Sequence, residues 1–142
     1  MFNPSREQVR QFFCEAWRKH RQRCVVDGAD AVAADLIANH PEYHALLENP
    51  DLALTEEFTP ESGRMNPFLH LSLHLAVAEQ ISIDQPRGIR AAYQTLRGRL
   101  EVHDAEHALI ECLGEALWHA QRQGGAIDQA AYIEAIRRAA ST

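Results

Sequence analysis

Apolar residues near the start of the chain recur at the spacing of one side of a helix. They are Val9, Phe12, Phe13, Ala16 and Trp17. Charged residues occupy most of the intervening positions as far as Arg23, so the pattern predicts an amphipathic helix that packs on a core. Asn3 or Ser5 can cap its first turn, and Pro4 suits a first helical position.

Segments bounded by prolines follow. A helix is predicted over residues 29–39, and its expected inner residues are Val32, Leu36 and Ile37. Pro41 ends this helix, because the residue before a proline avoids the α region, and a short helix over 41–48 can begin there. The stretch 49–64 contains two prolines and a glycine, and we expect it to be a loop.

Four stronger helical patterns fill the rest of the chain. They cover residues 66–81, 87–100, 103–122 and 128–139. Asn66-Pro67 opens the first, Gly124-Gly125 ends the third, and Asp128 caps the last. No alternating pattern typical of a strand occurs. The expected fold class is therefore all-α, a single-domain helical bundle of about five or six helices over residues 1–142.

Composition and charge limit the kind of protein this can be. Of the 142 residues, 46% are hydrophobic and 24% charged, and the formal net charge is −6. This is the balance of a globular domain with a mildly acidic surface, which argues against binding to nucleic-acid phosphates. Residues 1–10 lack the apolar stretch of a signal peptide, and no apolar run approaches the roughly 20 residues that cross a bilayer. We expect a cytoplasmic protein without membrane or nucleic-acid partners.

The cysteines do not suggest a disulfide framework. They number three, Cys14, Cys24 and Cys112, and none forms a C-x-x-C pair. Reduced thiols are the simplest interpretation, and a thiolate zinc site is not indicated. Cys112 lies on the apolar side of its predicted helix, where a buried structural thiol is expected.

The histidines are the clearest chemical signal. Among the eight, three pairs have the spacing H-x-x-x-H: His40/His44, His70/His74 and His103/His107. Residues four apart lie one above the other on a helix, so two imidazole nitrogens can reach one cation. Neutral imidazole binds zinc, iron, copper and nickel, and two facing helices could supply four nitrogens, as in metal sites built inside helical bundles.

The direction of each pair decides which histidines are candidate ligands. His70 and His74 share a face with Val77 and Ile81, so both are expected to point into the core. His103 and His107 lie at the edge of an apolar arc. The His40/His44 pair straddles a helix boundary at Pro41 and has the weakest helical spacing.

We therefore predict a transition-metal site. Its expected ligands are His70, His74, His103 and His107, completed or supported by His44, Glu106 or Glu111. Glu106 falls inside the apolar arc of its helix, where burial is costly unless the carboxylate is paired or binds a cation. Mixed nitrogen and oxygen ligands favour zinc, iron or manganese, and no organic cofactor is indicated.

Other interpretations stay open. Buried histidines often donate to backbone carbonyls or carboxylates without a metal, and the apolar helix at 68–81 is either fully buried or part of an interface. The chain would then be a non-enzymatic structural or interaction domain, such as a homodimer. Residues 103–107 also match the H-x-x-E-H motif of certain zinc proteases, but too few residues follow it for their fold. The sequence does not decide whether the protein is an enzyme.

Four strings resemble an uncharacterised bacterial family, domain of unknown function 1841. They are MFNPSREQVRQFF, HPEYHALLE, NPFLHLSLHLAVAEQISIDQPRGIRAAY and HDAEHALIECLGEALWHAQR, which together span nearly the whole chain. The chief departure is RQRCVVDGADAVA, between His20 and Ala34. The resemblance implies a bacterial, soluble, single-domain protein and places the six paired histidines within the family pattern, but it implies no activity.

Overall fold

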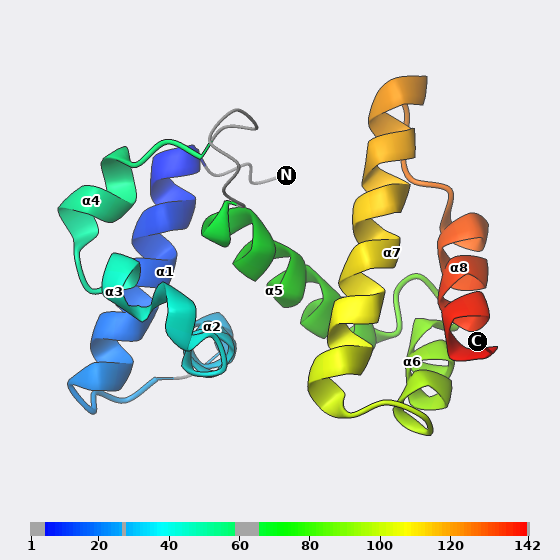
Figure 1. Cartoon of the computed structure of the whole chain (residues 1–142), viewed down its shortest axis with the longest axis horizontal. Helices are drawn as coiled ribbons and strands as arrows, with labels where there is room; N and C mark the ends of the chain where they lie inside the picture. The colour runs from blue at the N-terminus through cyan, green and yellow to red at the C-terminus, as the bar shows by residue number, and fades with distance from the viewer. Residues whose placement is uncertain (1–4, 27, 59–65, 142) are drawn as a thin grey trace. The chain divides into compact units, whose positions relative to one another are not determined.

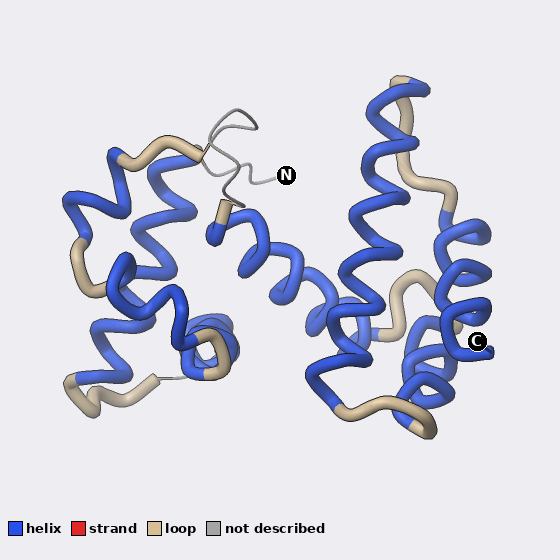
Figure 2. Tube along the Cα trace, in the orientation of Figure 1, coloured by secondary structure: helices blue, strands red, loops and turns tan. Residues whose placement is uncertain are grey.

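The structure is a computed structural model that describes residues 5–26, 28–58 and 66–141. All regular structure in these ranges is helical, and no strand occurs in them (Figures 1 and 2). The α-helices are α1 (Arg6–Arg21), α2 (Gly28–Ala38), α3 (His44–Leu47), α4 (Pro50–Thr55), α5 (Pro67–Ile83), α6 (Ile89–Arg97), α7 (Val102–Gln123) and α8 (Gln129–Ser141). A 3-10 helix, η1 (Pro41–Tyr43), precedes α3. The all-α fold class is confirmed.

The chain divides into two compact units, Met1–Leu75 and Ala76–Thr142. The helix α5 contributes to both, because its residues Phe68 and Leu71 belong to the first unit, and Val77 and Gln80 belong to the second. No helix in the described part of the chain is long and apolar enough to cross a membrane.

In the first unit, α1 packs against α2, α3 and α4 (Figure 1). Ser5 starts α1 with a capping box: its side chain accepts from the Gln8 amide, and the Gln8 side chain accepts from the Ser5 amide. This arrangement satisfies two amides that a helix start otherwise leaves without partners. The core contains Phe13, Ala16, Trp17, Ala33, Ile37, Leu47, Ala53, Phe68 and Leu71.

A buried arginine joins α1 to α4 and to the residue that ends it. Arg10 is 2% exposed. Its Nη1 donates to the carbonyl oxygens of Ala53, at 2.9 Å, and Glu56, at 2.8 Å. The guanidinium carbon also lies over two aromatic rings, 4.9 Å from the centroid of Phe68 and 5.6 Å from that of Phe58. Burial lowers the pKa of the Arg10 guanidinium, but arginine stays charged at any ordinary pH.

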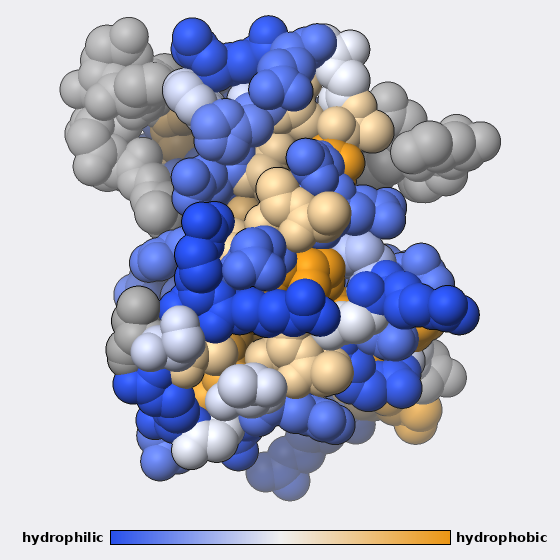
Figure 3. All heavy atoms as spheres, turned by 90° about the vertical axis from the view of Figure 1, so that its right-hand side faces the viewer, coloured by the Kyte–Doolittle hydropathy of each residue, from blue (hydrophilic) through white to orange (hydrophobic). Residues whose placement is uncertain are grey.

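In the second unit, α6 and α7 both pack against α8. Its core contains Val77, Ile89, Leu96, Leu109, Leu113, Tyr132 and Ile136. The Tyr132 hydroxyl donates to Gln80 Oε1 at 2.7 Å, which gives this buried phenol its polar partner. Figure 3 views this unit from the side on which α8 lies, where small apolar areas alternate with hydrophilic residues. That face has the character of ordinary solvated surface.

The turn between α5 and α6 is held by one carboxylate. Asp84 Oδ1 accepts from the amides of Arg90, at 3.0 Å, and Gly88, at 3.2 Å. These two backbone hydrogen bonds, chiefly that from Arg90, lower the pKa of the Asp84 carboxyl. Asp84 itself has φ 53°, a left-handed conformation that aspartate and asparagine tolerate better than most residues.

We expect Asp84→Asn to lower the thermal unfolding midpoint at neutral pH. Asparagine tolerates the same φ, so the substitution mainly removes the charge that both amides favour. Because the native carboxyl has a lowered pKa, its contribution is present above the usual aspartate value of about 3.9 and is lost as the pH falls through the native pKa. The gap between wild type and variant should therefore close in acid. Calorimetry over a pH series measures it, and a gap that does not change with pH would contradict the assignment.

The structure corrects several boundaries. There are eight α-helices in the described residues, more than the five or six predicted, because the segment before α5 is broken into short helices. Part of the predicted loop 49–64 is α4, where Asn49 accepts from the Leu52 amide and Pro50 occupies the first turn. Residues 59–65 of that stretch lie outside the described residues, as do Asn3 and Pro4. Val32, predicted to be an inner residue, is 39% exposed.

Candidate metal centre

The first candidate ligand lies just beyond the end of α2. His40 is 2% exposed and caps the start of η1. Its Nδ1 lies 2.7 Å from the Leu36 carbonyl oxygen, which can only accept, so the proton of a neutral ring is on Nδ1. The lone pair is then on Nε2, an atom that is itself buried. This is the tautomer of a histidine prepared to bind a metal through Nε2.

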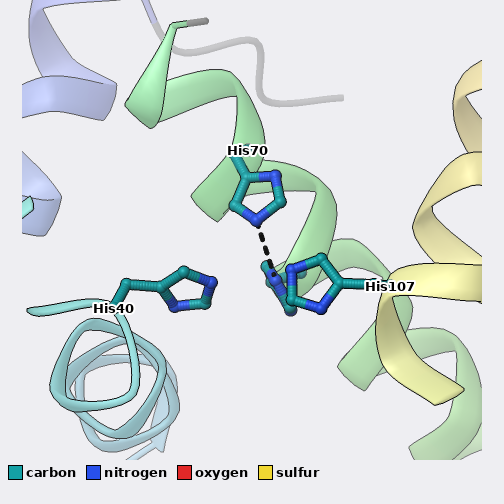
Figure 4. A group of neighbouring side chains, drawn as sticks. His40, His70 and His107 are labelled. Atoms are coloured by element: carbon teal, nitrogen blue, oxygen red, sulfur yellow. Dashed lines mark hydrogen bonds between the residues drawn. The ribbon is translucent and has the colours of Figure 1, made fainter. Parts of the chain in front are cut away.

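Two further candidates lie one turn apart on α5. His70 and His74 point their Nε2 atoms at each other across 3.2 Å, the contact drawn as a dashed line in Figure 4. Their rings are nearly perpendicular, at 78°, with centroids 4.7 Å apart. His74 is 2% exposed, and His70 is half-buried. The prediction that this pair points inward is confirmed for His74 and in part for His70.

These three rings form one cluster within the first unit, hereafter the three-histidine cluster. The ring centroid of His40 lies 5.1 Å from that of His70 and 4.7 Å from that of His74. One nitrogen from each ring lies within 4.8 Å of the others. The cluster therefore joins the end of α2 to the first half of α5 (Figure 4).

The spacing of the nitrogens suits a shared metal ion. Bonds of about 2.0 Å to two ligands of a tetrahedral centre place those nitrogens about 3.3 Å apart. The two Nε2 atoms of His70 and His74 are 3.2 Å apart. His40 approaches the same point with the nitrogen opposite its carbonyl hydrogen bond. The arrangement can thus supply three neutral nitrogen ligands.

The other member of the first pair, His44, has a different role. Its Nε2 donates to the Ile37 carbonyl oxygen at 2.7 Å, and its ring stacks on the indole of Trp17 with centroids 4.4 Å apart. His40 and His44 therefore both bind carbonyls at the C-terminal end of α2, which a helix leaves without internal partners. His44 is not among the histidines whose nitrogens gather.

The remaining predicted ligands lie on α7, in the second unit. The rings of His103 and His107 are 4.1 Å apart, and His107 Nδ1 lies 2.8 Å from the His103 carbonyl oxygen. His107 and Glu106 are half-buried, whereas His103 and Glu111 are exposed. Their part in a metal site stays a prediction, made from their spacing in the sequence.

The cysteines, and the two histidines that belong to no H-x-x-x-H pair, lie outside the three-histidine cluster. His20 and His119 are exposed, as expected for surface residues. Cys14 is buried, Cys112 is half-buried and Cys24 is exposed. Burial raises the pKa of the Cys14 and Cys112 thiols, which keeps both in the neutral form that binds metals poorly.

His40 is the candidate ligand that the sequence analysis did not include in the predicted set. It belongs to a recognised H-x-x-x-H pair, but the following proline made a shared helical face implausible. The same proline was the signal that could have separated the two histidines. Pro41 starts the 3-10 helix η1, which has His40 as its N-cap, whereas His44 follows η1 and donates to an α2 carbonyl. The pair therefore acts as two separate residues.

Fold and cluster together define an all-helical protein in which three histidine rings converge at one point. The chain belongs to the family described as Domain of unknown function (DUF1841), which matches residues 5–138. No curated protein and no solved structure matches the chain.

Proposed function

We propose that the protein binds one transition-metal ion through His40, His70 and His74. The observation that carries the proposal is the convergence of three imidazole nitrogens within 4.8 Å, two of them already 3.2 Å apart. The Leu36 carbonyl supports it by fixing the tautomer of His40, as carbonyl partners do for metal-bound histidines. Binding a metal here is the proposed function, and no reaction is assigned to it.

Neutral nitrogen ligands narrow the choice of metal. Imidazoles suit zinc, copper, nickel and iron, whereas manganese and other hard ions prefer carboxylate and carbonyl oxygen. The sequence suggested zinc, iron or manganese on the assumption of mixed nitrogen and oxygen ligands. A centre built from His40, His70 and His74 favours zinc over manganese.

The direct test is the metal content of protein purified without a histidine tag. We expect close to one zinc or other late first-row ion per chain in the wild type, and near zero in His70→Ala/His74→Ala, which loses two of three ligands. His119→Ala is the matched control, because His119 is exposed and lies outside the cluster. Unchanged metal content in the double variant would contradict the proposal that His70 and His74 are metal ligands.

The same assay tests the ligands predicted on α7. If His107 also binds the ion, as its spacing from His103 suggests, His107→Ala should weaken metal retention during dialysis against a chelator. His119→Ala, on the same helix but outside the predicted set of ligands, serves as the control and should leave retention unchanged. Equal retention in wild type and in His107→Ala would leave the ion to the three-histidine cluster alone.

A second candidate function is a structural or interaction domain with hydrogen-bonded core histidines. The observation that favours it is the pair of bonds from His40 and His44 to the α2 carbonyls, which need no metal. Thermal stability that does not change on adding chelator or zinc would support this alternative, because a ligand that binds only the folded state must raise its stability.

A further inference from the structure

A groove lies between α7 and α8, within the second unit. The two helices pack side by side and are joined through residues 124–128 (Figure 1). The groove has a volume of about 270 Å³ and follows α7 from Cys112 to Gln123, which is roughly 16 Å of helix at about 1.5 Å per residue. A groove of this volume suits a small organic molecule rather than a protein segment.

Alanines leave the groove open. Ala116 and Ala120 on α7 line it, as do Ala131 and Ala135 on α8. The members of each pair are four residues apart and therefore lie on one face of their helix. A larger side chain at these positions would fill the space between the helices, whereas a methyl group leaves both room and an apolar wall. The groove can therefore bury the apolar part of a ligand.

One end of the groove combines a neutral thiol with a cation. Burial raises the pKa of the Cys112 thiol, which keeps it neutral near pH 7, and the charge of Arg138 opposes this effect. Arg138 also lines the groove, so its guanidinium lies at the end where Cys112 is found. A guanidinium can bind a carboxylate through two parallel hydrogen bonds, which give the contact both strength and direction.

The charged side chains that line the groove differ in their partners. Asp128 Oδ1 accepts from the Ala131 amide at 3.0 Å. Glu115 Oε1 lies 3.7 Å from His119 Nε2. In the described part of the chain, the Arg138 guanidinium forms no hydrogen bond or ion pair. Since the two carboxylates already have partners, the groove favours a ligand with a negative end over one with a positive end.

We infer that the groove between α7 and α8 binds a small carboxylic acid with a linear apolar chain. The carboxylate binds the Arg138 guanidinium, and the chain lies along the alanines of both helices toward Gln123. An amine of the same length would lack the attraction to Arg138, and an alcohol would lack the charge. The inference does not rest on the proposed metal site, because none of the described residues that line the groove is a predicted metal ligand.

The experiment titrates the full chain with hexanoate, hexylamine and hexanol, three probes that differ mainly in their polar end. Chemical shifts of the backbone amides in NMR spectra report both the affinity and the place of binding. We expect hexanoate to bind at one molecule per chain, to shift amides on both α7 and α8, and to bind at least tenfold more tightly than the other two probes. Near pH 7 the acid is ionised and the amine is protonated.

Two variants test the residues that carry the inference. Arg138→Gln removes the cation and should weaken hexanoate binding by about tenfold or more, the size of a lost charge-assisted hydrogen bond, without changing hexanol binding. Arg137→Gln is the matched control, because Arg137 is exposed and lies outside the lining of the groove. Ala135→Leu should fill the groove and weaken all three probes, whereas Ala130→Leu, at an exposed position of α8, should not.

The inference is overturned by any of three results. Hexylamine or hexanol may bind as tightly as hexanoate, which would show that Arg138 does not select the ligand. Hexanoate may cause no amide shifts at millimolar concentration. Hexanoate binding may be the same in wild type, Arg138→Gln and Ala135→Leu, which would place the ligand elsewhere. Circular dichroism checks that each variant folds, and Arg138→Gln, a change at an exposed residue, keeps the test decisive if Ala135→Leu does not fold.

Discussion

Arg10→Ala is expected to destabilise the first unit by about 3 kcal/mol, the range seen when a buried hydrogen-bonding group is removed. The substitution deletes both charge-assisted bonds, to the Ala53 and Glu56 carbonyls, and leaves a cavity beside Phe68. The Ala53 carbonyl would then lie in the core without the partner that compensates its burial. Urea unfolding followed by circular dichroism measures the loss.

The matched control is Arg6→Ala on the same helix. Arg6 is exposed, and its ion pair with Glu57 spans 3.4 Å between groups in contact with water. Exposed pairs contribute little, so a change within about 0.5 kcal/mol is expected. Similar losses in Arg6→Ala and Arg10→Ala would show that the buried guanidinium is not a major source of stability.

Leu109→Ala should have an effect of similar size on the second unit. Leu109 is fully buried on α7, and truncation of a buried leucine costs about 3 kcal/mol through lost apolar contact and the cavity left behind. Leu117→Ala, on the same helix, removes the same atoms from a side chain that is 38% exposed and should cost far less. A loss at position 117 equal to that at 109 would contradict the assigned core.

The two core variants together address the domain organisation. The prediction of a single domain over residues 1–142 requires one cooperative unfolding transition that both Arg10→Ala and Leu109→Ala lower. Separate transitions, each lowered by only one variant, would contradict it and would show that the units Met1–Leu75 and Ala76–Thr142 unfold independently.

The helices with the strongest patterns were predicted well because local chemistry defines their ends. Gly124 adopts φ 71° at the end of α7, a conformation that suits glycine, and Asp128 accepts from the Ala131 amide at the start of α8. α4 was missed although its signals are also local, since Asn49 is its cap and Pro50 its first residue. The density of prolines and glycine in 49–64 favoured a loop.

The three-histidine cluster was predicted only in part because its members are distant in sequence. Helical spacing alone brings His70 and His74 together on α5. Spacing does not show that the residue after α2, His40, lies beside these two rings. That placement depends on packing between segments that are distant in the sequence. For the same reason the pattern could not show that His40, and not His44, joins the cluster. The two side chains bind different carbonyls, those of Leu36 and Ile37, and contact different aromatic rings.

The helix α5 has a consequence for how the family can vary. Its residues 67–75 help to build one core and its residues 76–83 the other, on a single uninterrupted helix. One residue inserted within either half of α5 would turn the later side chains of that half by about 100° about the helix axis and direct part of its core face away from its neighbours. Insertions and deletions should therefore accumulate in the connections between helices, whereas each half of α5 should keep its length throughout the family.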